Sequence, residues 1–246
     1  MVVARQIVEF TEAVPAAVRR TICHGLLLAQ LAADKIVPDG EEASEWFQAY
    51  TVVLSRIGFA QNNQQIQTQE LSGANAPLLE AAIPVLRDAV GPTAAARSQL
   101  QAMLGQLAHS DDALPSIALL GRKIRSGGGG FGLTNVDRGE DGVSRMTSLF
   151  VSVEGSREVT SILFFRTTKV DVKVRTVVIN ATIDANSLAA IDTVLAAKVA
   201  PFVRDNISGL HLREPQTKPA TPLNTPSQET SAQIPTTSPS RQPLTQ

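Results

Sequence analysis

Apolar residues near the start of the chain recur at three- and four-residue steps, the spacing of one face of an α-helix. The stripe begins at Val3 and continues through Phe10. Pro15 interrupts it, and a proline either kinks a helix or begins a new one, because it has no amide hydrogen to donate. We therefore expect helix over residues 3–37, with a central, well-covered helix at 18–31.

Several further segments have helical spacing. Asp39 and Glu42 resemble a capping pair before a helix whose buried face includes Trp46 and Tyr50. Residues 59–71 are rich in Gln and Asn and fit either a short strand or an extended loop, of which we favour the strand. The other expected helical segments are residues 75–90, 93–108 and a short apolar segment that ends near residue 120.

The pattern changes to alternation after residue 121. A basic, glycine-rich stretch comes first, and three strand-like runs follow at residues 146–153, 159–167 and 169–183, which is typical of an antiparallel meander. The apolar positions of the third run change phase by one residue, so we expect a β-bulge near Thr176. Asp184 then caps a final helix, in which Pro201 predicts a kink or an early end.

These segments predict an α+β fold: four to five N-terminal helices packed on a small antiparallel β-meander, followed by a C-terminal helix. The last segment is rich in Pro, Thr and Ser and has no aromatic residue, so it predicts a disordered tail. The expected organisation is a helical region at 1–121, a Gly-rich polar connector at 122–143, the meander and helix at 144–212 (one domain with 1–121), and the tail at 213–246.

Charge argues against nucleic acid as a partner, because the net charge of the 246 residues is −1. Residues 1–121 hold 7 basic and 12 acidic side chains, whereas residues 122–175 hold 10 and 6. Such halves are suited to docking on each other or on a second copy, although ordinary variation of surface charge is the simpler interpretation.

The cysteine content and the length of the apolar stretches indicate in which cellular compartments the protein can reside. Cys23 is the single cysteine, so no intramolecular disulfide forms. Acidic residues precede any apolar stretch near the N-terminus, unlike a secretory signal. The apolar stretch Thr21–Ala33 is 13 residues, short of the roughly 18 that span a bilayer. We expect no transmembrane segment, and a protein that is cytoplasmic or exported without a cleavable signal peptide.

Partial matches to cofactor and metal-binding motifs occur in the sequence, but each lacks the flanking elements or the ligands that such a site requires. Gly127, Gly129 and Gly132 have the spacing of a dinucleotide loop, but no buried strand precedes them and no helical pattern follows. Asp137–Gly142 resembles the start of a calcium loop but has no glutamate at its twelfth position. The three histidines are dispersed, and Cys23 and His24 point to different sides of a helix. We expect no cofactor, metal or catalytic residue.

One candidate contact remains, the basic stretch of Arg122, Lys123 and Arg125 beside the glycines. It is suited to an anionic membrane surface or an acidic partner, although a solvated face is the simpler interpretation.

Together these patterns favour a non-enzymatic interaction protein that binds a protein partner, itself or a membrane surface, of the kind found among exported effector- or toxin-like proteins. The alternative is an enzyme or small-molecule binder with dispersed site residues at the helix-to-sheet junction. Its candidates are His109, Asp111, Arg122 and Arg125.

Overall fold

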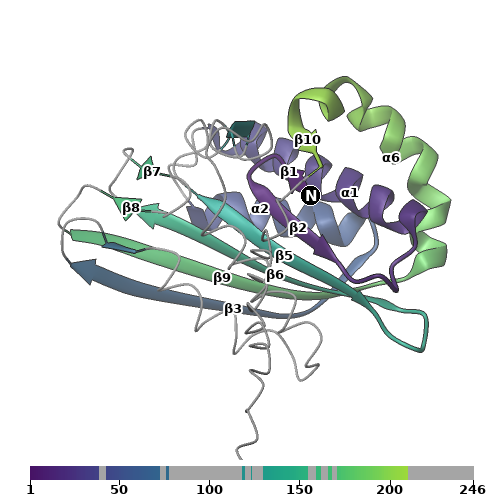
Figure 1. Ribbon diagram of the computed structural model, residues 1–246, viewed down its shortest axis with the longest axis horizontal. Coiled ribbons are helices and arrows are strands. Elements are labelled where there is room, and N and C mark those ends of the chain that lie inside the picture. Colours follow the sequence, from purple (N-terminus) through teal and green to yellow (C-terminus); the bar gives the residue numbers. More distant parts are fainter. Residues whose placement is uncertain are drawn as a thin grey trace, which may run out of the picture. The chain divides into compact units, whose positions relative to one another are not determined.

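A computed structural model provides the structure of the protein (Figure 1). The chain divides into two compact units, Met1–Arg213 and Glu214–Gln246, and all of the described residues belong to the first. The structure describes residues 1–38, 43–72, 76–77, 118–119, 123, 130–154, 159–161, 166–167 and 171–209.

A seven-stranded mixed sheet organises this unit, in the order β10-β1-β2-β5-β6-β9-β3. Its strands β2 and β5 pair in parallel, and all of its other neighbours are antiparallel. The strands are β1 Val2–Val3, β2 Gln6–Phe10, β3 Phe59–Ser72, β5 Phe131–Arg138, β6 Ser144–Glu154, β9 Asp171–Ile183 and β10 Ile207–Ser208. A smaller sheet has the order β4-β8-β7, with β4 Ala76–Pro77, β7 Val159–Ser161 and β8 Arg166–Thr167.

Three helices lie within the described residues: α1 Ala16–Ile36, α2 Ala43–Arg56 and α6 Ala185–Asn206. Figure 1 shows α1 and α2 on the same side of the large sheet, and α6 packs against α1. Pro15 occupies the N-cap of α1, where its missing amide hydrogen costs no bond. The Asp184 carboxylate caps α6 by accepting a hydrogen bond of 2.9 Å from the Ser187 amide.

The main core lies between α1, α2 and the face of the sheet beneath them, where Leu26, Leu54 and Ile179 are fully buried. Four aromatic rings fill its centre, with centroids 5.0–5.8 Å apart. Such distances are favourable for edge-on and offset aromatic pairs. The rings belong to Trp46, Phe47, Tyr50 and Phe150.

The opposite face of the sheet is also covered. Ile7, Leu133, Leu149 and Val178 alternate with the residues that face the helices, and none of them is more than 1% exposed. The central strands are therefore buried on both sides, so their sequences are apolar without strict alternation.

The predicted helical start is wrong, and with it the predicted fold of four to five helices on a small antiparallel meander. Residues 2–10 form β1 and β2, and only the residues after Pro15 are helical. The spacing of Val3, Ile7 and Phe10 satisfied a helical template because β2 is buried on both faces, which removes the alternation that identifies a strand. The protein is still a mixture of helices and sheet.

The predicted meander and connector also differ from the structure. The connector, residues 122–143, contains β5 in the middle of the sheet, and β6 pairs directly with β9. The predicted middle strand, residues 159–167, instead contains β7 and β8, which pair in the small sheet. The strand favoured at 59–71 is confirmed as β3. The helix expected at 75–90 is wrong at its start, where Ala76–Pro77 form β4, and the rest of it lies outside the described residues, as does the helix expected at 93–108.

The predicted bulge is misplaced. β9 pairs with β6 without interruption from 173 to 183, and the register shift lies in β3 between Gln61 and Asn63. The apolar phase of β9 changes because Val177 and Val178 are buried on opposite faces, so no slip of the strand is needed. The last helix starts as predicted but does not end early, since it continues through Pro201 to Asn206.

Candidate functional site

A cluster of buried polar side chains lies beneath α1 and α2, in an otherwise apolar core. Gln6 of β2 is its centre and is fully buried. The Gln6 amide nitrogen donates to the hydroxyls of Thr134 on β5 and, at 3.5 Å, Ser148 on β6. These hydroxyls are 2.7 Å apart and bond to each other. Three neighbouring strands are thus joined through side chains as well as backbone.

The helices complete this cluster from above. The Gln30 side-chain amide of α1 donates to the Val3 backbone carbonyl at 3.0 Å and to the Gln6 side-chain Oε1 at 3.3 Å. The Tyr50 hydroxyl of α2 also donates to the Gln6 oxygen, at 3.4 Å. Complete burial raises the pKa of Tyr50, and the hydrogen bond to Gln6 opposes that shift only in part.

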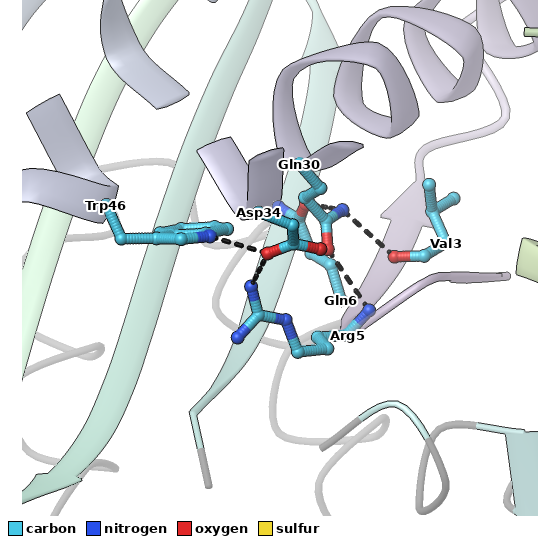
Figure 2. A network of polar contacts seen from close by, with 6 residues as sticks. All are labelled: Val3, Arg5, Gln6, Gln30, Asp34 and Trp46. Carbon is cyan, nitrogen blue, oxygen red and sulfur yellow. Dashed lines mark hydrogen bonds and ion pairs between the residues drawn. The ribbon is translucent and has the colours of Figure 1, made fainter. Parts of the chain in front are cut away.

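An ion pair lies at the edge of the cluster, as Figure 2 shows. The Arg5 guanidinium bonds to the carboxylate of Asp34 on α1, and the same Asp34 oxygen accepts a hydrogen bond of 2.7 Å from the Trp46 indole. Arg5 also lies over the Trp46 ring, 4.6 Å from its centroid, at a cation–π distance. The Arg5 backbone amide donates to the Gln30 oxygen at 3.1 Å.

The two partners of this ion pair differ in their exposure to solvent. The Arg5 side chain is 9% exposed and that of Asp34 is 46% exposed. Burial lowers the pKa of Arg5, and the Asp34 carboxylate acts against that shift. A buried guanidinium needs such a partner, because an unpaired charge costs several kcal/mol in the interior. The arrangement therefore positions β2 under the helices through bonds among its own polar groups.

A second polar group joins α1 to α6. Asp192 of α6 accepts from the Thr21 hydroxyl and from Arg20 at 3.1 Å, and these bonds lower its pKa. His24 lies beside them, and its buried Nδ1 has no hydrogen-bond partner among the residues that the structure describes. Burial lowers the pKa of His24, with the Asp192 charge acting against the shift and the Arg20 charge reinforcing it.

Cys23 has the environment of a packing residue. It is fully buried in α1, and its thiol lies 3.9 Å from the Met1 sulfur. Burial raises the pKa of Cys23 from 9.0 to about 12, so the thiolate that a nucleophile or metal ligand requires is scarce at neutral pH. Among the described residues, no three His, Cys, Asp or Glu side chains gather as a metal site would require.

α6 exposes apolar side chains on its outward side and along the border of its buried stripe. Val194 is 61% exposed and Phe202 is 45% exposed. The exposed residues around them include Ala189, Ala190, Ala197 and Ala200, together with Lys198 and Arg204. The stretch Asn186–Asn206 is the one described helix long and apolar enough, by length and composition, to cross a membrane, and 17% of its apolar 18-residue window is buried.

The site residues predicted from the sequence are mostly outside the described chain. Of the basic stretch, Lys123 is half-buried, and Arg122 and Arg125 lie outside the described residues. So do His109 and Asp111 of the alternative site. Both sets therefore stay predictions.

Neither the Gln6 cluster nor the exposed side of α6 was among the sites predicted from the sequence. The cluster left no local signal, because Gln6 and Thr134 are 128 residues apart. The α6 surface did leave one: between Leu188 and Val203 the charged residues are Asp192 and Lys198.

Comparison with known proteins yields a weak likeness to solved structures. No family model matches the chain, and no characterised protein matches its sequence. The solved structure of the Evf virulence factor is similar over 83% of this chain and 81% of that chain, with a TM-score of 0.38 and 12% identity. A likeness this weak assigns no activity or partner.

Proposed function

We propose that this protein is a non-enzymatic interaction protein that binds a membrane surface through the outward side of α6. The observation that carries the proposal is that α6 combines the length and composition of a membrane-crossing helix with only 17% burial of its apolar 18-residue window. A core helix of the same composition would be covered. α6 packs on α1 along one stripe, which includes Leu188, Leu195 and Val199, and leaves its other side open.

The chemistry of that side suits the boundary between lipid headgroups and acyl chains. Val194 and Phe202 supply the apolar side chains that enter the boundary, and the exposed alanines of the same helix add no charge of their own. Lys198 and Arg204 are exposed on the same helix, and long basic side chains reach toward anionic headgroups from such positions. The basic stretch Arg122, Lys123 and Arg125 is proposed as a second contact with those headgroups.

A partner protein is the second candidate occupant. The alanines of α6 favour it, because small side chains let another helix approach closely. Exported effector- or toxin-like proteins belong to the same proposed class, since they act by engaging a membrane or a partner.

The test is flotation of the full chain with vesicles of zwitterionic lipid and with vesicles that also contain anionic lipid. We expect wild-type protein to float with the anionic vesicles, less so at high salt. Val194→Glu should lower the partition coefficient roughly tenfold to a hundredfold, because it replaces an apolar contact with a charge that the vesicle repels. Replacing Arg122, Lys123 and Arg125 with Gln should weaken flotation on anionic vesicles only.

The matched control is Val52→Glu, since Val52 of α2 is also a large exposed apolar residue, at 42%. It should float like the wild type. Absence of flotation, together with a partner whose capture Val194→Glu abolishes, would favour the protein candidate. Absence of both, with stabilisation by a metabolite in a thermal-shift screen, would instead favour the enzyme or small-molecule binder.

A further inference from the structure

The outer edge of β3 is a long strand edge that no described strand covers. β3 is last in the order of the large sheet and pairs with β9 from Phe59 to Ser72 (Figure 1). Every second residue of an edge strand directs its backbone N–H and C=O away from its one neighbour. An edge of this length is therefore a template for another extended chain.

The sequence of β3 has few of the features that prevent edge pairing. Natural edge strands are commonly blocked by lysines, prolines or bulges. Residues 59–72 contain no Lys, Arg or Pro, and seven of the nine residues from Gln61 to Gln69 are Gln or Asn. The bulge between Gln61 and Asn63 lies near one end, and the register with β9 is regular from Asn63 to Ser72.

An apolar side chain is exposed on this edge. Ile66 is 59% exposed, although the Val177 residue that pairs with it on β9 is 1% exposed. On the same face of the strand, Gln64 and Thr68 are also exposed. On this face of the sheet, the buried core therefore ends at Val177 of β9. Its apolar cross-strand neighbour on β3, Ile66, is exposed to solvent.

We propose that β3 pairs antiparallel with β3 of a second copy of this chain, with the two Ile66 residues opposite each other. This register buries the exposed isoleucine against itself. It also sets uncharged residues opposite one another from Asn63 to Gln69, and it sets Glu70 opposite Asn62. A parallel, in-register pair would instead set the two Glu70 residues opposite each other, which like charge disfavours.

A second copy is the partner favoured by the chemistry of the strand. Each Gln or Asn amide carries both donors and an acceptor, so a row of amides is complementary to a copy of itself. The pairing also closes on itself, because a two-fold axis uses the same edge of both molecules. The opposite edge of the sheet is β10, two residues long, which is too short to extend the assembly.

The first test is sedimentation of the full chain over a range of concentrations. We expect a concentration-dependent species of twice the 26.1 kDa chain mass. Ile66→Lys should remove it, because two ammonium groups would then face each other at the axis, and the variant should fold because Ile66 is exposed. Val52→Lys is the matched control, with Val52 at 42% exposure, and should dimerise like the wild type.

The second test is of the register. With the Ile66 residues paired, Ile66→Cys should form an intermolecular disulfide on mild oxidation. Thr68→Cys should not crosslink with itself, because it would lie about 13 Å from its symmetry mate, but it should crosslink with Gln64→Cys in a mixture. Buried Cys23 stays in place in all of these variants.

The pairing is wrong if the chain sediments as a monomer at every concentration, even if it then binds an unrelated extended peptide at β3. A dimer that Ile66→Lys leaves intact overturns it as well. The outcome is independent of the membrane proposal, because Val194→Glu should weaken vesicle binding and leave the dimer unchanged, whereas Ile66→Lys should abolish the dimer in solution.

Discussion

At the scale of single residues, the buried side chain of Gln6 requires hydrogen-bond partners from several elements at once. Its amide group bonds to side chains from β5, β6, α1 and α2. Buried polar groups cost free energy unless they are paired, and this set is satisfied only when the strands and both helices are aligned. The cluster therefore contributes to the specificity of the arrangement as well as to its stability.

Replacing Gln6 with Leu should destabilise the protein by about 2–4 kcal/mol, because several buried groups lose their partner at once. Tyr50→Phe removes only the 3.4 Å bond and should cost about 1 kcal/mol or less. Urea unfolding of the two variants and the wild type measures the difference. Equal losses would show that Gln6 is not the centre of the cluster.

The Cys23 thiol should be nearly inert in the folded protein. Its pKa of about 12 against 9.0 corresponds to a thiolate fraction roughly a thousandfold lower at neutral pH, and the side chain is also buried. Ellman's reagent at pH 8 should label the native chain far more slowly than the urea-unfolded chain. Fast stoichiometric labelling of the native chain would contradict the packing around Cys23.

The raised pKa of Cys23 should make the free energy of unfolding depend on pH in the alkaline range. Below about pH 9 the thiol is protonated in both the folded and the unfolded chain, so it contributes no pH dependence. Between about pH 9 and 12 the unfolded chain loses its proton first. The free energy of unfolding should therefore fall over that range, and it should fall less in Cys23→Ala.

At the scale of elements, the helices that could be predicted are those whose sequences contain their own signals. Asp184 caps α6 as expected, and the buried face of α2 at Trp46, Tyr50 and Leu54 follows the helical spacing. β2 could not be identified in this way. Its apolar residues are buried on both faces of the sheet, which removes the alternation that would identify a strand.

The contact between α1 and α6 should weaken in acid through His24. Its pKa is lowered in the folded state by burial, with Asp192 opposing and Arg20 adding to the shift. Below about pH 6.5 the unfolded chain therefore binds the proton more readily, and the free energy of unfolding falls as the pH falls. Urea unfolding at pH 7 and pH 5 should show a smaller loss for His24→Gln than for the wild type.

An equal loss of stability in the two proteins would contradict this role for His24. Asp192→Asn is an informative companion variant, because it removes the nearby charge that favours protonation of His24. In that background the unfavourable effect of acid on His24 should be larger.

At the scale of the whole molecule, the sequence analysis predicted a mixed protein of helices and strands but not its connectivity. The parallel pairing of β2 with β5 joins residues 6–10 to residues 132–136. No pattern within either segment specifies the other as its partner. The Gln6 cluster depends on that pairing, so it was unpredictable for the same reason, whereas the exposed apolar surface of α6 was visible in its own sequence.

The parallel pairing also determines when the protein can fold during synthesis. At a ribosomal rate of 5–20 residues per second, residues 6–10 wait on the order of ten seconds for residues 132–136 to be made. β1 waits longer still for β10, at residues 207–208. Throughout that interval Ile7 and Val8 have no strand to cover them, so the nascent chain is a substrate for chaperones that hold apolar segments until the later strands emerge.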